Sequence, residues 1–226
     1  MYKYETHLHT SPVSKCAKST VKEMLLFYKK LGYDGVFVTN HFIDGNCACD
    51  RSASYEDQIK FYFSDYEAAK ALENEVGIKV FAGVELSNRG TDFLVYGLDK
   101  EWFLAHPEIM GMKKSEELTL MAQCGAFIVQ AHPYREAAYI DHIRLFPRHV
   151  HGVEIINGNQ NDFVNGLAEH YAKSYSLIPC AGTVNHSADR SSNVCGMEFD
   201  EPVISVDDYI EKVKEGKGMP FKLSLE

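Results

Sequence analysis

Two histidines separated by one residue, His7 and His9, end the first strand-like stretch of this 226-residue chain. Side chains alternate between the two faces of a strand, so both imidazoles are expected on one face and Leu8 on the other. Imidazole is the commonest metal ligand in proteins, but it is also an ordinary polar group. The pair alone therefore fits either a metal site or two hydrogen-bonded histidines, and further ligands must decide.

Further residues that can bind a metal stand at or just beyond the carboxyl ends of other short apolar stretches. They are His41 after 35–39, Glu85 at the end of 79–85, His132 after 126–130 and His186 after 177–183. These stretches have the length and composition of buried strands. In parallel α/β folds, ligands bind at the carboxyl ends of the strands. The sequence therefore predicts one metal site formed by His7, His9, His41, Glu85, His132 and His186.

The remaining histidines serve as a control for this placement argument. His149 and His151 also form a His-x-His pair, but they precede a strand, so they are expected at the surface on the opposite face. His142 and His170 fall on expected helices and His106 in a loop before a proline. For these three, a solvated or packing role is the simpler interpretation.

Short apolar strands alternate with helical patterns along the whole chain. The expected strands end near residues 9, 39, 85, 97, 130, 156 and 183, and the expected helices cover 21–31 behind Ser19, 57–76, 115–124, 136–145, 162–175 and 206–215. This alternation predicts an α/β fold with a parallel sheet, either a barrel or an open doubly wound sheet. The glycine-rich motifs of dinucleotide and nucleoside-triphosphate folds do not occur.

The composition indicates one domain spanning 1–226, with no linker or repeat. The net charge of −9 disfavours nucleic acid and anionic membranes as partners. The first residues lack the apolar region of a secretory signal, and no apolar run is long enough for a membrane span, so we expect a cytoplasmic protein. The six cysteines are expected to be reduced, and the Cys47-Ala48-Cys49 pair is assigned no role.

Four segments together resemble the PHP (polymerase and histidinol phosphatase) domain, a family of metal-dependent phosphoesterases, over nearly the whole chain. They are His7-Leu8-His9, Thr39-Asn40-His41, Gly83-Val84-Glu85 and Ala131-His132-Pro133, and Gly152 to Asn157 is similar to the family's sixth strand. The resemblance implies a distorted seven-stranded β/α barrel of the TIM-like kind. It also implies two or three divalent ions, often zinc, manganese or iron.

The chain departs from the family pattern at three places. Ser14-Lys15-Cys16 stands where the family has an Asp or His, and Val184, with Asn185 beside it, stands where the closing motif has a carboxylate. A histidine of the fourth strand region is also missing; Asp92 or Asp99 could replace it, and Asp99 has the better expected position, just past the strand end. These departures predict fewer or weaker ions than the family maximum.

The leading functional hypothesis is a hydrolase that attacks a small phosphorylated metabolite with metal-activated water. His7, His9, Glu85 and His132 would hold an ion pair, while His41 and His186 would bind a third ion, assist the leaving group or act as a general acid. Arg135 is placed to clamp a phosphate. Two alternatives stay open: a metal-dependent hydrolase of a non-phosphate bond, and a degenerate module that binds phosphate or a partner without catalysis. The sequence indicates neither the substrate nor the oligomeric state.

Overall fold

The computed structural model describes residues 1–225, which form a mixed α/β fold. The elements are β1 (Tyr2–Leu8), α1 (Val21–Lys30), β2 (Gly35–Val38), α2 (Tyr55–Val76), β3 (Lys79–Ala82), β4 (Val84–Asn88), β5 (Thr91–Tyr96), α3 (Lys100–Ala105), a 3-10 helix (Pro107–Gly111), α4 (Lys114–Gln123), β6 (Phe127–Ala131), β7 (Gly152–Asn157), α5 (Asp162–Tyr175), β8 (Ile178–Gly182), β9 (Val194–Phe199), α6 (Val206–Lys214) and β10 (Met219–Leu223). No helix in this described range is long and apolar enough to cross a membrane.

Within residues 1–225 the strands form two five-stranded sheets. The first has the order β10-β9-β1-β2-β3, with β1, β2 and β3 parallel and β9 and β10 antiparallel at its edge. The second has the order β4-β5-β6-β7-β8, where β5 is antiparallel to both neighbours and β6, β7 and β8 are parallel. The α/β class predicted from the sequence is confirmed.

Two isolated parallel bridges connect the sheets, one between Leu8 and Asn185 and one between His41 and Glu85. β3 leads into β4 through Gly83 alone, so one nearly continuous segment pairs first with β2 and then with β5. The ladders in the described part of the chain remain two sheets, and the closed seven-stranded barrel stays a prediction.

Helix α6 fills the space between the sheets at the amino ends of their parallel strands. Its Tyr209 ring lies 4.6 Å from the ring of Phe37 on β2 and 5.4 Å from the ring of Tyr96 on β5. Burying these aromatic side chains removes a large apolar area from water at this end of the fold. The carboxyl ends of the parallel strands lie at the opposite end, which leaves that end for polar groups.

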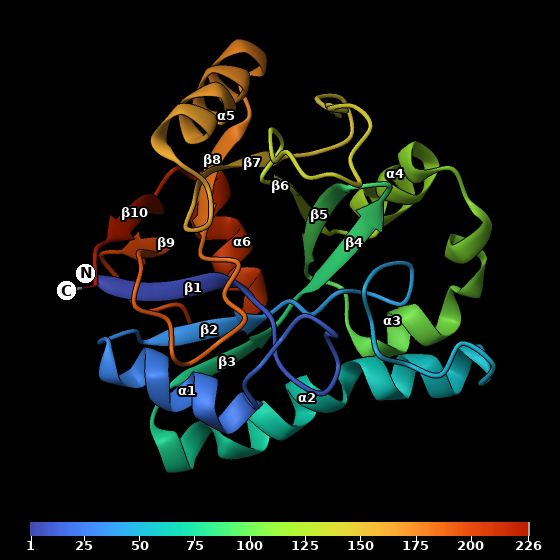
Figure 1. Cartoon of the computed structure of the whole chain (residues 1–226), viewed down its shortest axis with the longest axis horizontal. Coiled ribbons are helices and arrows are strands. Elements are labelled where there is room, and N and C mark those ends of the chain that lie inside the picture. The colour runs from blue at the N-terminus through green and yellow to red at the C-terminus, as the bar shows by residue number, and fades with distance from the viewer. Residues whose placement is uncertain (226) are drawn as a thin grey trace.

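Helices α1 and α2 cover the outer face of β1, β2 and β3 (Figure 1). The N-cap of α1 is Thr20, one residue after the predicted Ser19, because Thr20 and Glu23 form a reciprocal capping box. Its Met24 and Leu25 pack in one apolar cluster with Leu8. Leu8 therefore faces the helix layer, and its neighbours in the strand face the space between the sheets.

The predicted helix 136–145 is wrong, because this segment forms turns and loops. The Gln130 side chain bonds the backbone there, donating to Arg144 O at 2.8 Å and accepting from Phe146 N at 3.0 Å. Strands β9 and β10 were also not expected. Gly196 lies within the first, where a Cβ atom would collide with the Tyr4 carbonyl oxygen, and Pro220 lies in the second, which is an edge strand and tolerates proline.

Candidate metal centre

The buried carboxylate of Glu85 lies at the centre of four imidazoles. His7 Nε2 is 3.0 Å and His132 Nε2 3.5 Å from Glu85 Oε1, while His9 Nε2 is 3.4 Å and His41 Nδ1 2.6 Å from Oε2. The two oxygens of one carboxylate therefore face different pairs of histidines. The structure brings together residues from β1, β2, β4 and β6, as the strand-end argument predicted.

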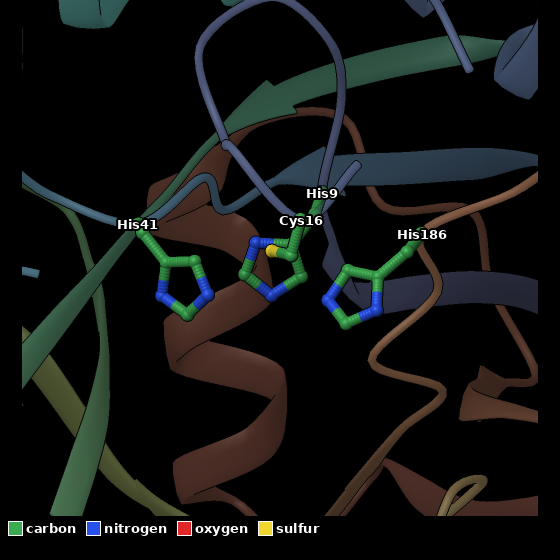
Figure 2. Close-up of side chains that lie close together, drawn as sticks. All are labelled: His9, Cys16, His41 and His186. Carbon is green, nitrogen blue, oxygen red and sulfur yellow. The ribbon is translucent and has the colours of Figure 1, made fainter. Parts of the chain in front are cut away.

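The donor atoms divide into two clusters. The inner cluster contains His7, Glu85 and His132, all buried, and the outer cluster contains His9, Cys16, His41 and His186. In each cluster the potential ligand atoms lie within 4.8 Å of one another. Figure 2 shows the outer cluster, with His9 and the Cys16 sulfur in the middle and His41 and His186 on either side.

The donor set fits divalent metal ions because its buried polar atoms lack hydrogen-bond partners. Among the described residues this holds for His7 Nε2, His9 Nε2, His41 Nδ1, His132 Nε2, His186 Nε2 and both Glu85 oxygens. Buried polar groups are rarely left unpaired in native proteins. Two ligands of a tetrahedral zinc ion, each about 2.1 Å from the metal, lie about 3.4 Å apart. The contacts of 3.0–3.5 Å between Glu85 and His7, His9 or His132 have this spacing.

Glu154 on β7 orients the inner cluster from behind. Its Oε1 lies 3.0 Å from His7 Nδ1, and its Oε2 accepts hydrogen bonds from His132 N at 3.0 Å and Asn157 Nδ2 at 2.7 Å. A carboxylate that holds the second ring nitrogen of a histidine fixes the tautomer that leaves Nε2 free for a metal. The sequence argument did not identify Glu154, and it named Asn157 only as the end of the segment similar to the family's sixth strand.

Ser14 performs the corresponding task in the outer cluster. Its hydroxyl lies 3.2 Å from His9 Nδ1, donates to Asn40 Oδ1 at 2.8 Å and accepts from His41 N at 3.0 Å. Asp65 on α2 in turn accepts from Asn40 Nδ2 at 3.2 Å. Because the hydroxyl proton goes to Asn40, Ser14 accepts from His9 Nδ1–H, which leaves His9 Nε2 as the metal-facing atom.

The close packing of charges shifts the pKa values of these groups strongly. Burial by itself would raise the pKa of the Glu85 carboxyl, but the imidazoles of His41 and His7 outweigh it and hold that pKa well below its usual range. Burial would lower the pKa of His7, but Glu154 and Glu85 raise it to about 10. Burial and the neighbouring His41 hold the pKa of His9 well below its usual range. The site therefore combines a fixed negative centre with imidazoles of very different basicity.

Two residues of the site have left-handed backbone conformations that side chains rarely adopt. His132 has φ of 28° and Val184, whose β-branched side chain is disfavoured there, has φ of 54°. Such conformations cluster at functional sites, where surrounding contacts hold them. The His132 conformation directs its backbone N–H to Glu154 while its ring faces Glu85.

Asp92, and not Asp99, lies at the site, so the preference for Asp99 is wrong. Asp99 caps helix α3, accepting from Trp102 N at 2.8 Å, whereas the buried Asp92 Oδ2 lies 3.8 Å from His132 Nε2. The reason is that β5 runs antiparallel to β4 and β6, so its amino end lies beside their site-forming residues. The two-residue turn at Arg89-Gly90 was the available signal, because a parallel crossover needs a dozen or more residues.

Asp92 also holds Arg135, whose Nη2 lies 3.1 Å from Asp92 Oδ2. A cavity of about 390 Å³ opens above the outer cluster. Its lining residues are Cys16, His41, Asn46, Ser87, Gly90, Asp92, Arg135, Tyr139, Val184 and His186. Arg135 packs under the exposed Tyr139, with its guanidinium carbon 5.8 Å from the ring centre. The structure thus places the predicted substrate residue Arg135 at the mouth of the site.

The control histidines lie elsewhere, as predicted. His149 Nδ1 is 3.3 Å from the Thr119 hydroxyl, and His151 Nδ1 accepts from Ile128 N at 3.0 Å. Both are half-buried rather than fully at the surface, because His151 packs against Phe127 of β6 and His149 lies beside Thr119 of α4. Cys16 was missed as a member of the site, since the sequence argument treated its segment only as a place where a ligand is lost.

No protein-family model matches this sequence, and no curated protein sequence matches it. Solved structures do match. A two-domain protein from Bacteroides vulgatus ATCC 8482, described as containing a predicted PHP-like metal-dependent phosphoesterase, superposes with a TM-score of 0.69 at 14% identity, over 97% of this chain and 64% of that chain. This chain has the PHP-like metal-dependent phosphoesterase fold. It spans 64% of the length of the Bacteroides protein.

Two further structures share this fold. A candidate metal-dependent phosphoesterase from Bifidobacterium adolescentis ATCC 15703 has a TM-score of 0.54 at 12% identity, covering 92% of this chain and 94% of that chain. An amidohydrolase from Chromobacterium violaceum, solved with bound sulfate, has a TM-score of 0.54 at 14% identity, covering 81% of this chain and 87% of that chain. The structural neighbours therefore include candidate phosphoesterases and an amidohydrolase.

Proposed function

We propose that this protein is a metal-dependent phosphoesterase of the PHP family that hydrolyses a small phosphorylated metabolite. The observation that carries the proposal is the set of buried imidazole and carboxylate atoms without hydrogen-bond partners, which converge on Glu85 within the described residues. A hydrophobic interior tolerates such a set only when cations compensate it. The distorted seven-stranded barrel that the family resemblance implies is part of the same proposal.

The residues that would hold two ions follow from the two faces of Glu85. His7, His132 and Glu85 Oε1 would hold the inner ion, while His9, His41, His186 and Glu85 Oε2 would hold the outer one. Divalent ions bound there would polarise a phosphoryl oxygen and lower the pKa of a bound water toward neutrality. Zinc, manganese and iron are the candidates. We propose His41 and His186 as ligands in preference to general acids, because their nitrogens face the same cluster.

The substrate would enter the cavity above the outer cluster. Arg135 is fixed by Asp92 through one terminal nitrogen, so its remaining donors can bind two phosphoryl oxygens. A cavity of about 390 Å³ suits a metabolite, and the net charge of −9 disfavours a polyanionic chain. Arg135 would therefore position the phosphate against the ions.

A substrate panel with matched variants tests this proposal. Purified protein loaded with manganese or zinc should release phosphate from at least one class of phosphorylated metabolite. Glu85→Gln should lower the metal content and abolish turnover with modest loss of stability. His149→Ala should leave the metal content and the turnover unchanged. Equal effects of the two substitutions would refute the site.

The likeness to an amidohydrolase favours one second candidate, hydrolysis of a non-phosphate bond by the same centre. Amide and ester substrates in the same panel separate the two reactions. A protein with less than one tightly bound ion per chain, and no turnover after adding manganese or zinc, would instead support a module that binds without catalysis.

A further inference from the structure

The thiol of Cys16 stands among three histidines of the outer cluster. Its sulfur and one nitrogen each of His9, His41 and His186 lie within 4.8 Å of one another (Figure 2). Cys16 is half-buried and borders the cavity. It comes from the segment between β1 and α1, where the sequence predicts the loss of a ligand.

Backbone hydrogen bonds fix the position of Cys16 from both sides. Lys15 N donates to Asn46 O at 3.0 Å, and Lys18 N donates to His186 O at 2.7 Å. The segment is thereby attached to the loop after β2 and to the loop after β8, which also carry the histidines. The thiol is therefore placed by the same contacts that place its neighbours.

The three histidines direct buried nitrogens into this cluster. His9 Nε2, His41 Nδ1 and His186 Nε2 are buried and have no hydrogen-bond partner in the part of the chain that the structure describes. A thiolate is the form that binds metals. Cysteine sulfur and histidine nitrogen are the ligands that zinc prefers, so a thiolate beside these imidazoles suits zinc.

The inner cluster offers a different chemistry. Its donors are two imidazoles and Glu85 Oε1, with Asp92 Oδ2 3.8 Å from His132 Nε2, so oxygen takes the place of sulfur. Thiolate ligands favour soft and borderline ions, whereas carboxylates also suit manganese. The two positions differ in the one donor that discriminates most between zinc and manganese.

We propose that Cys16 is a metal ligand that makes the outer position selective for a thiophilic ion of the zinc class, while the inner position also accepts manganese. This inference rests on the proposed two-ion centre and names the ion that each half prefers. Replacing the family's Asp or His by Cys changes the type of ligand and keeps a ligand in place.

Metal content measured under competition tests the inference. Metal-free wild type, Cys16→Ser, Cys16→Asp and the control Cys124→Ser, whose exposed thiol follows α4, are equilibrated with zinc in a large excess of manganese. Wild type and Cys124→Ser should keep one zinc per chain. Cys16→Ser should lose it, and Cys16→Asp should keep an ion but shift the zinc-to-manganese ratio at least about tenfold toward manganese. Unchanged zinc in Cys16→Ser overturns the inference.

Cobalt substitution gives a readout that needs no activity. Wild type and Cys124→Ser loaded with Co²⁺ should show a thiolate-to-cobalt charge-transfer band in the near ultraviolet, and Cys16→Ser should lack it. Turnover of phosphate esters without this band in wild type would refute the thiolate ligand and leave the proposed function intact. The band without any turnover would support the thiolate ligand and contradict the proposed function.

Discussion

Glu154→Gln is the sharpest test of how the inner position is built. The Glu154 carboxylate accepts from His132 N–H and Asn157 Nδ2–H, and its other oxygen holds His7 Nδ1 at 3.0 Å. A glutamine keeps one oxygen and replaces the other with a donor. If the amide group faces His7 Nδ1, it favours the tautomer with the proton on Nε2, which cannot bind a metal. If it faces His132 N–H, two donors oppose each other.

Either orientation should weaken metal binding without removing a ligand. Substitution of such supporting groups typically lowers metal affinity 10- to 100-fold, which corresponds to about 1.4–2.8 kcal/mol. Titration against a chromophoric chelator measures this change, and the cobalt–thiolate band reports separately on the outer position. We expect weaker inner binding with an unchanged band.

A matched substitution shows whether the effect is specific. Glu169→Gln removes an exposed carboxylate on α5 that pairs with Lys173, so metal affinity should equal that of the wild type. Glu154→Gln with wild-type affinity would contradict the role of Glu154. A drop in melting temperature of the same size with and without metal would show a purely structural effect, since metal binding stabilises only the folded state.

Three further predictions concern backbone space, substrate binding and pH. Gly182→Ala places a methyl carbon 2.5 Å from His7 Cβ, so it should reduce metal content and lower the free energy of unfolding in urea by about 1–3 kcal/mol. Gly166→Ala, on α5 with open space around it, should raise that free energy by about 1 kcal/mol. Arg135→Lys should raise KM for the phosphorylated substrate about tenfold with unchanged metal content, and an unchanged KM would exclude a phosphate clamp. Burial raises the pKa of Glu73, but hydrogen bonds from two lysines and a backbone N–H lower it to about 2. Its folded pKa lies below the ordinary 4.5, so its stabilising contribution is present above pH 4.5 and is lost as the pH falls toward 2. The stability difference between wild type and Glu73→Gln should therefore shrink over this interval, and a constant difference would argue against it.

The strand-end rule predicted the convergence of the histidines because it needs only the direction of the strands. His7, His41 and His132 follow or end strands that run parallel to a neighbour, and the carboxyl ends of such strands meet at one edge. Alternation along β1 then sends Leu8 to the helix layer. Both rules are local, so the sequence was sufficient.

The strand-end rule predicted the wrong aspartate at β5, which runs antiparallel to its neighbours. The expectation for Asp99 assumed that β5 runs parallel to its neighbours, and a hairpin turn brings Asp92 to the site in its place. Cys16 and Glu154 were missed for another reason. Their positions depend on contacts across the fold, from Lys15 and Lys18 to other loops and from Glu154 to His7, which leave no periodic pattern in the sequence.

The missing carboxylate at Val184 shows what the fold retains when a ligand is lost. A β-branched residue at φ of 54° costs about 1–3 kcal/mol, so surrounding contacts must hold this turn. Val184 O accepts from Asn159 Nδ2 at 2.8 Å, and the next residue, Asn185, pairs through its backbone with His7 O at 3.2 Å and His9 N at 3.0 Å. The turn thus ties the end of β8 to both histidines of β1. Because that task uses only backbone atoms, a side-chain donor at position 184 can be absent while His7 and His9 keep their places.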